Sequence, residues 1–319
     1  MSATAETLVA AVPSRGTSLK RRIRSLGTVG IASAVVIAIA TLVAVFAPLL
    51  TPQDPNASNL AATYLGPSSS HLLGTNDTGQ DILSRLIAGS RLSLLGPLAV
   101  AVLATSSSLL LAIIAAWRRG WADTVINGMN NLLFAFPGII LAILTATVFG
   151  ASLTAAVLAI TIAYVPSIVR VLRSAAVVER NQTYVAALEI QGFSATTICL
   201  RHLIPNMAPL IVAELTLQFG FAMVDLSALS FIGLGTQPPS ADWGVMVANG
   251  QTGLLQGYPM ESLSAGIAIF IVVLAFTLLG ERLASGGGVD YRSRGSWLTL
   301  RSPRRRVEAI ERAGGTPSR

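Results

Sequence analysis

The chain has 319 residues, of which 52% are apolar and only 12% are charged, with a formal net charge of +7. Soluble globular domains carry about 25% charged residues, so this composition excludes a disordered chain and argues against a soluble enzyme. One cysteine and two histidines also exclude a disulfide framework and a Cys/His metal cluster. We therefore expect an all-α protein that crosses a membrane several times.

Apolar stretches long enough to cross a bilayer recur along the chain, since the hydrocarbon core needs about 20 helical residues. None of them alternates as a half-buried strand would, so each is predicted to be a transmembrane helix. The first follows a basic segment and is too long for a cleaved signal peptide, so it is predicted to be an uncleaved anchor. The six predicted spans are 29–50, 92–117, 132–149, 151–169, 208–234 and 263–280.

Basic residues are distributed unevenly between the connecting segments. With the N-terminus in the cytoplasm, 20 of the 22 Lys and Arg residues fall on the cytoplasmic side. The positive-inside rule therefore predicts a multi-pass protein of the plasma or inner membrane with both termini cytoplasmic. The expected organisation is a basic tail 1–28, a first span 29–50, an outer loop 51–91 with an amphipathic helix, a core domain 92–280 that includes a cytoplasmic loop 170–207, and an Arg-rich cytoplasmic tail 281–319.

The outer loop ends in a segment that is predicted to form the amphipathic helix. This helix is expected to lie on the outer membrane surface or over the entrance to a pathway. Its predicted polar side consists of Asp77, Asp81, Arg85 and Arg91. His71 and His202 are isolated in the sequence, and we expect them to serve loop structure rather than to bind a metal.

The loop 170–207 is too long for a simple connector. Gly192 follows a helix-forming stretch and is suited to end a helix, and Ser194 is suited to cap the next one. The pattern predicts a helix, a turn and a second helix. Ala186, Ala187 and Gly192 would let another protein approach the backbone closely, although an ordinary amphipathic hairpin has the same pattern.

Two acidic residues, Glu214 and Asp225, lie inside the fifth predicted span. Eleven helical residues correspond to about 20° past three turns, so both acids share a helix face, to which Gln218 also belongs. Ionisable groups inside a membrane are costly and usually face the bundle interior. One interpretation is a pathway stripe that meets a cationic group such as a peptide amino terminus; the other is interhelical hydrogen bonding.

The sequence contains no Gly-x-x-x-x-Gly-Lys-Ser/Thr loop, no Gly-x-Ser-x-Gly elbow and no His-Glu-x-x-His. We therefore predict no catalytic residues and no cofactor in this chain. A channel, a secondary transporter and an ATP-driven permease remain as alternatives.

Four ordered blocks carry a resemblance to a known family. Gly192 and Pro205 have the spacing of the Glu-Ala-Ala-x3-Gly loop of ABC importer permeases, with Ala186 at the position of the motif glutamate. Arg201–Asn206 resembles the same loop in the dipeptide/oligopeptide/nickel permease family. The segments 71–91, 135–137 and 228–244 also resemble that family. The chain is similar to its C-type subunit over residues 25–292, roughly.

The resemblance implies a type I ABC importer permease fold with six transmembrane helices. It implies a second homologous permease subunit, two ATPase subunits that bind ATP and Mg²⁺, and an external substrate-binding protein. Because the distribution of basic residues reflects membrane topology, we expect no nucleic-acid partner. The residues expected to contact the ATPase are Ala186, Ala187, Glu189, Gly192 and Pro205. In the outer loop, Trp243 and Tyr258 are expected to be membrane-interface anchors or contacts for the binding protein.

The substrate that the resemblance implies is a di- or oligopeptide or a similar small solute. One alternative is an ABC importer for nickel or metal chelates. Another is a proton-coupled secondary transporter that uses Glu214 and Asp225, although six spans without an evident inverted repeat argue against it. A third is a scaffold or channel subunit that does not pump.

Overall fold

The computed structural model describes residues 27–118 and 120–286. The predictions for 1–26 and 287–319, which include most of both tails, lie outside the described residues. Within the described ranges the chain folds into helices and loops, with an isolated bridge between Thr75 and Asp81. The helices are α2 (Gly27–Leu50), η1 (Leu60–Ala62), α3 (Ile82–Arg118), α4 (Trp121–Phe134), α5 (Gly138–Phe149), α6 (Leu153–Arg180), α7 (Thr183–Ile190), α8 (Ala195–Ile198), the π-helical η2 (Cys199–Leu203), α9 (Ile204–Phe231), α10 (Trp243–Leu255) and α11 (Met260–Gly286).

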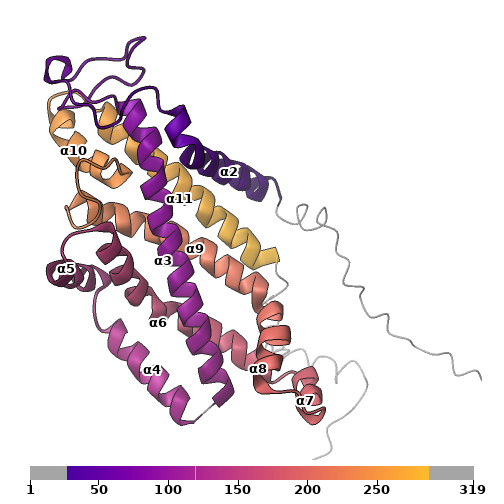
Figure 1. Cartoon of the computed structure of the whole chain (residues 1–319). Coiled ribbons are helices and arrows are strands. Elements are labelled where there is room, and N and C mark those ends of the chain that lie inside the picture. Colours follow the sequence, from indigo (N-terminus) through magenta and orange to yellow (C-terminus); the bar gives the residue numbers. More distant parts are fainter. Residues whose placement is uncertain (1–26, 119, 287–319) are drawn as a thin grey trace, which may run out of the picture.

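Five helical segments of the described chain are long and apolar enough to cross a membrane. They correspond to α2, α3, α6, the continuous stretch from α8 to α9, and α11, and they coincide with five of the six predicted spans. The protein is therefore a multi-pass membrane protein. The five segments pack together as one bundle (Figure 1).

The third predicted span, 132–149, takes a different form. α4 ends at Phe134 and α5 begins at Gly138, with Pro137 between them. Proline lacks a backbone N–H and disfavours the helical conformation of the residue before it, and both effects favour a break between the two helices here. α5 has 12 residues and is about 18 Å long, which is too short to cross the hydrocarbon core by itself.

The predicted outer helix is not separate from the second span, because both belong to α3, a single helix of 37 residues. The predicted polar side is divided, because Asp77 and Arg91 are exposed whereas Asp81 and Arg85 are only 4% and 2% exposed. Asp81 accepts hydrogen bonds from the backbone and hydroxyl of Ser84 and contacts His71 at 3.0 Å. These partners let Asp81 face inward.

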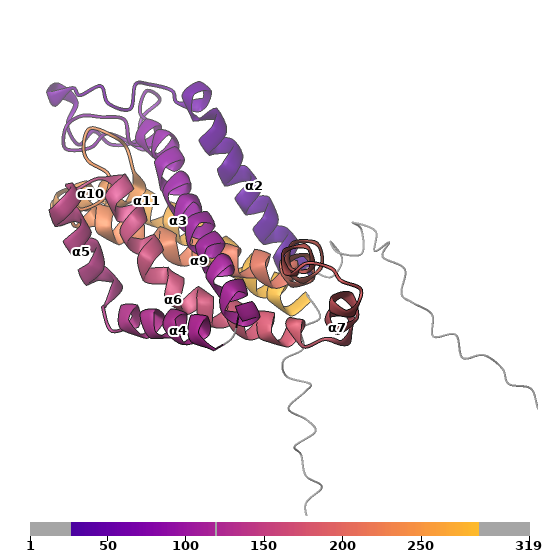
Figure 2. The same ribbon diagram turned by 60° about the horizontal axis from the view of Figure 1, so that its bottom comes forward.

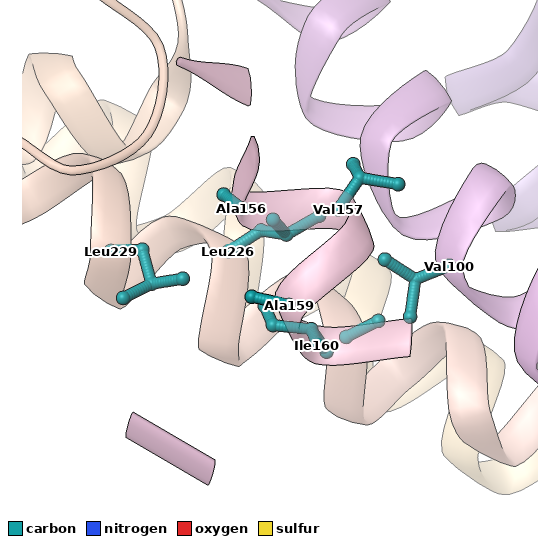
Figure 3. Packing of buried hydrophobic residues seen from close by; sticks show 8 residues of the cluster. Val100, Ala156, Val157, Ala159, Ile160, Leu226 and Leu229 are labelled. Atoms are coloured by element: carbon teal, nitrogen blue, oxygen red, sulfur yellow. The ribbon is translucent and has the colours of Figure 1, made fainter. Parts of the chain in front are cut away.

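The centre of the bundle is the crossing of α3, α6 and α9 (Figures 1 and 3). Val100 of α3, Ile160 of α6 and Leu226 of α9 are at most 4% exposed and belong to one apolar cluster. Ala156 and Ala159 of α6 are buried in the same cluster. Because alanine has a small side chain, the three helix backbones approach closely and form one rigid unit.

α4 is fastened to α6 by an ion pair outside the apolar core. The Arg173 guanidinium donates hydrogen bonds to both carboxylate oxygens of Asp123, at 2.6 and 2.5 Å. These bonds hold the pKa of the Asp123 carboxyl below its usual range. The pair is therefore charged at neutral pH, and α4 keeps its position against α6.

Gly244, in the first turn of α10, allows this helix to lie against α9. A Cβ atom at Gly244 would be 2.6 Å from the Ser227 backbone oxygen and 2.9 Å from its Cα. We expect Gly244→Ala to destabilise the fold by about 1–3 kcal/mol, because backbone atoms have to move. Thermal unfolding of the purified protein in detergent measures this effect. Gly266→Ala in α11 is the matched control, since a Cβ there meets nothing within 4 Å. The midpoint temperature of unfolding of this variant should stay unchanged or rise.

Candidate coupling site and transport face

The helix–turn–helix predicted for 170–207 is confirmed as α7 followed by α8, and α7 projects from the lower end of the molecule (Figures 1 and 2). Gly192 has φ +81° and ends α7. The Phe193 N–H donates to the Leu188 carbonyl at 3.1 Å and the Gly192 N–H donates to the Glu189 carbonyl at 3.0 Å, which is the pattern of a Schellman cap. The Ser194 hydroxyl accepts from the Thr197 N–H and begins α8, as expected.

The surface of α7 consists mainly of small and apolar groups. Ala186, Ala187 and Glu189 are exposed, and Ile190 is 87% exposed. Val185 is only 1% exposed and anchors the helix to the rest of the fold. This surface has the features of a protein docking site, because exposed apolar side chains and small residues favour close contact.

Pro205 lies in the first turn of α9, across η2 from α8, and is exposed. Its missing N–H interrupts the regular helical hydrogen-bond pattern, and the chain forms the π-helical η2 directly before this turn. The π-helical η2 makes the chain continuous from α8 into α9. A displacement of the α7–α8 turn can therefore reach the transmembrane helix directly.

Three polar side chains tie α7 to the two neighbouring transmembrane helices, and we call them the polar clamp: Glu179 of α6, Tyr184 of α7 and Asn206 of α9. The Glu179 carboxylate accepts from the Tyr184 hydroxyl at 2.7 Å and from the Asn206 amide at 2.9 Å. The Asn206 amide also donates to the Tyr184 oxygen at 3.2 Å. Burial and the bond to Glu179 raise the pKa of Tyr184 to about 12, so the hydroxyl keeps its proton at physiological pH.

The polar clamp is not evident from the sequence. Its three members are spread over 28 residues, and only the return of the chain from α6 through α7 to α9 brings them together. The available signal was that each polar residue lies at the end of a helix beside an apolar span.

The acidic face of α9 separates into two hydrogen-bonded pairs. Glu214 accepts from the Gln218 amide of the same helix at 2.8 Å, and Gln218 is buried. Asp225 is exposed and accepts from the Tyr164 hydroxyl of α6 at 2.7 Å. The three predicted residues therefore do not form one cluster, and Asp225 is the member that faces away from the core of this chain.

The structure separates the two aromatic residues predicted at the outer surface. Trp243 is only 5% exposed, because its indole N–H donates to the Leu86 carbonyl at 2.8 Å and its ring packs in the core. The prediction of a surface role is therefore wrong for Trp243. Tyr258 is 47% exposed and stacks on Tyr64 with ring centroids 4.6 Å apart, so it remains available for a contact.

Comparison with known proteins decides the class of this helical bundle. Residues 108–285, which include α6, α7, α9 and α10, match the family described as binding-protein-dependent transport system inner membrane component. The chain belongs to this family. Residues 28–67, which include α2, also match the N-terminal transmembrane domain of oligopeptide transport permease C.

Several permeases of the family are similar over most of their length. A dipeptide transport system permease of Alkalihalophilus pseudofirmus is 36% identical over 246 residues, which are 76% of this chain and 79% of the relative. A protein of Escherichia coli K12, named a probable D,D-dipeptide transport system permease, is 36% identical over 251 residues, covering 79% and 84%. A glutathione transport system permease of Pectobacterium atrosepticum is 33% identical over 256 residues, covering 80% and 85%.

Family membership confirms the resemblance found in the sequence. The chain is a transmembrane permease component of a binding-protein-dependent ABC transport system. This assignment favours the importer interpretation over proton-coupled secondary transport. A permease of this class works together with ATPase and substrate-binding partners.

Proposed function

We propose that this chain forms half of the translocation pathway of an ATP-driven importer for di- or oligopeptides or a similar small solute. Relatives that cover most of the chain are named for the transport of dipeptides, D,D-dipeptides and glutathione, and these names support a short peptide as the substrate. In this proposal a second homologous permease subunit forms the other half. Two ATPase subunits bind ATP and Mg²⁺, and an external protein delivers the substrate.

The observation that carries the proposal is the exposed α7 surface joined to α6 and α9 by the polar clamp. The coupling residues in this proposal are Ala186, Ala187, Glu189, Gly192 and Pro205. An ATPase subunit that binds this surface displaces α7 when the ATPase subunits close. The polar clamp then transmits this displacement to α6 and α9. The uneven distribution of basic residues supports a cytoplasmic location for α7 and for both termini.

Asp225 is the proposed substrate contact in the pathway. A carboxylate inside a membrane is too costly to face lipid, so an exposed one faces a water-filled path or a protein partner. Tyr164 leaves the second carboxylate oxygen of Asp225 free for a cationic group, such as a peptide amino terminus. Glu214 and Gln218 are hydrogen-bonded to each other and lie on the same helix nearer its cytoplasmic end. Tyr258, in the loop between α10 and α11, is a proposed contact for the binding protein.

The proposed assembly is tested by affinity purification of the tagged full chain from native membranes. We expect two kinds of partner to co-purify: a second permease and P-loop proteins that hydrolyse ATP. Recovery of the chain without any P-loop protein, under conditions in which its fold is retained, would contradict the proposal.

A second test addresses the polar clamp. Tyr184→Phe removes the hydroxyl that joins α7 to Glu179, and hydrogen bonds to charged groups contribute about 1.5–3 kcal/mol. We expect the ATPase subunits to stay bound while the ratio of ATP hydrolysed to peptide imported rises several-fold. Asn206→Ala should act in the same direction. Tyr64→Phe in the outer loop is the matched control, and an equal effect of this variant would exclude a specific role for the clamp.

A further inference from the structure

A loop joins the upper ends of α2 and α3 (Figures 1 and 2). Two adjoining cavities are lined by residues of both helices, and one of them is also lined by residues of this loop. The lower cavity has a volume of about 350 Å³ and is lined almost entirely by apolar side chains of α2, α3, α9 and α11. The upper cavity has a volume of about 760 Å³ and is lined in part by polar residues of the loop. Arg91 and Leu95 of α3 border both cavities, so the two form one site with a polar and an apolar part.

Arg91 is a cation without a partner at the junction of the two cavities. Its side chain is exposed and makes no hydrogen bond or ion pair with any residue in the described part of the chain. It lies nine residues into α3, about 14 Å from the outer end of the helix. It directly precedes the predicted membrane-spanning part of α3, 92–117, so it lies near the level of the lipid headgroups, and its planar fork matches a phosphate.

Asp54 supplies the opposite charge in the upper cavity. One of its carboxylate oxygens accepts from the Asn56 N–H at 2.9 Å, and no ion pair joins Asp54 to Arg91 among the described residues. The upper cavity therefore presents a cation and an anion that are separated from each other. A ligand with a negative group for Arg91 and a positive group for Asp54 is complementary to this arrangement.

The lower cavity indicates what the rest of the ligand is. Val45, Leu95 and Leu98 are 62%, 57% and 43% exposed, and they form an apolar strip directly below Arg91. The stacked rings of Phe219 and Phe276 also line this cavity. A surface of this kind at membrane depth suits a hydrocarbon chain, and a soluble peptide would leave most of it uncovered.

We propose that this groove binds a phospholipid with a zwitterionic phosphoethanolamine headgroup. Its phosphate accepts from Arg91, its ammonium group donates to Asp54, and an acyl chain lies along Val45, Leu95 and Leu98. The lipid thereby joins α2 to the core of the bundle. This site is separate from the coupling surface and from Asp225, so it does not depend on the proposed transport function.

The test uses the full chain with its co-purifying subunits, reconstituted into bilayers of equal parts phosphatidylethanolamine and phosphatidylglycerol. The complex is then released from the bilayers, and the lipids that remain bound to it are counted by native mass spectrometry. We expect wild type to retain phosphatidylethanolamine preferentially and Arg91→Gln to retain about tenfold less of it. Asp54→Asn should keep lipid binding but lose the preference. Arg282→Gln, at the far end of α11, controls for lipid carried over from the bulk.

A second variant keeps the proposal falsifiable if Arg91→Gln fails to fold. Val45→Trp fills the lower cavity from α2 and leaves Arg91 intact, and it should displace the lipid, while Arg91→Lys should retain part of it. Equal retention of both lipids by wild type, or unchanged retention in Arg91→Gln and Val45→Trp, would show bulk lipid only and overturn the proposal.

Discussion

Replacement of Gly192 by arginine is expected to abolish peptide uptake while the chain stays in the membrane at its normal level. Gly192 has φ +81°, a conformation that costs about 1–3 kcal/mol for a residue with a side chain. No atom of the described residues lies within 4 Å of a Cβ built there, so the side chain starts in open space and is expected to extend into the proposed ATPase contact. Uptake of labelled peptide and the membrane level of the tagged chain are measured in the same cells.

Two further variants separate backbone strain from obstruction of the docking surface. Gly192→Asn introduces a residue that tolerates the left-handed conformation and should retain most of the uptake. Gly192→Ala introduces the backbone strain without a bulky side chain, and its peptide uptake should lie between those of Gly192→Asn and Gly192→Arg. Uptake at the wild-type rate by Gly192→Arg would show that this turn does not contact the ATPase during transport.

Asp225→Asn is expected to raise the concentration of peptide needed for half-maximal uptake by about tenfold, because a charge-assisted bond to the substrate is lost. The effect should be confined to peptides with a free amino terminus, and uptake of N-acetylated peptides should change little. In Glu214→Gln the concentration for half-maximal uptake should stay near the wild-type value, because Gln218 already donates a hydrogen bond to that carboxylate within the same helix. Competition uptake assays with matched free and acetylated peptides measure the difference.

Tyr164→Phe provides the control for this comparison. It removes the hydrogen bond to Asp225 but keeps the carboxylate, so selectivity for a free amino terminus should persist. If neither Asp225→Asn nor Glu214→Gln changes uptake of either peptide, the acidic face of α9 is structural.

Helix periodicity and turn chemistry predicted much of this fold from the sequence. The α7–α8 turn was predictable because Gly192 and Ser194 act within one turn of their own positions, and five spans were predictable because hydrophobic length alone defines them. The third span was not, because the break at Pro137 depends on whether neighbouring helices compensate for the missing hydrogen bond. Length and composition cannot reveal that.

The side chains that build the sites were harder to predict, because tertiary contacts decide which face of a helix is buried. Residue pattern grouped Asp81 and Arg85 on one polar side but could not show that their partners lie within the fold. Trp243 was expected at a membrane interface because aromatic residues gather there, and only the contact with Leu86 reveals its burial. The clamp residue Asn206 and the lipid-site residue Arg91 gain their significance only from elements distant in sequence.

The central claim is that this permease moves peptide at the expense of ATP. The most direct measurement uses proteoliposomes that contain the purified complex, the external binding protein and a labelled dipeptide, with ATP supplied only to the ATPase side. We predict accumulation of the peptide against its gradient when ATP and Mg²⁺ are present and no proton gradient is imposed. Accumulation that instead requires a proton gradient and proceeds without ATP would contradict the account.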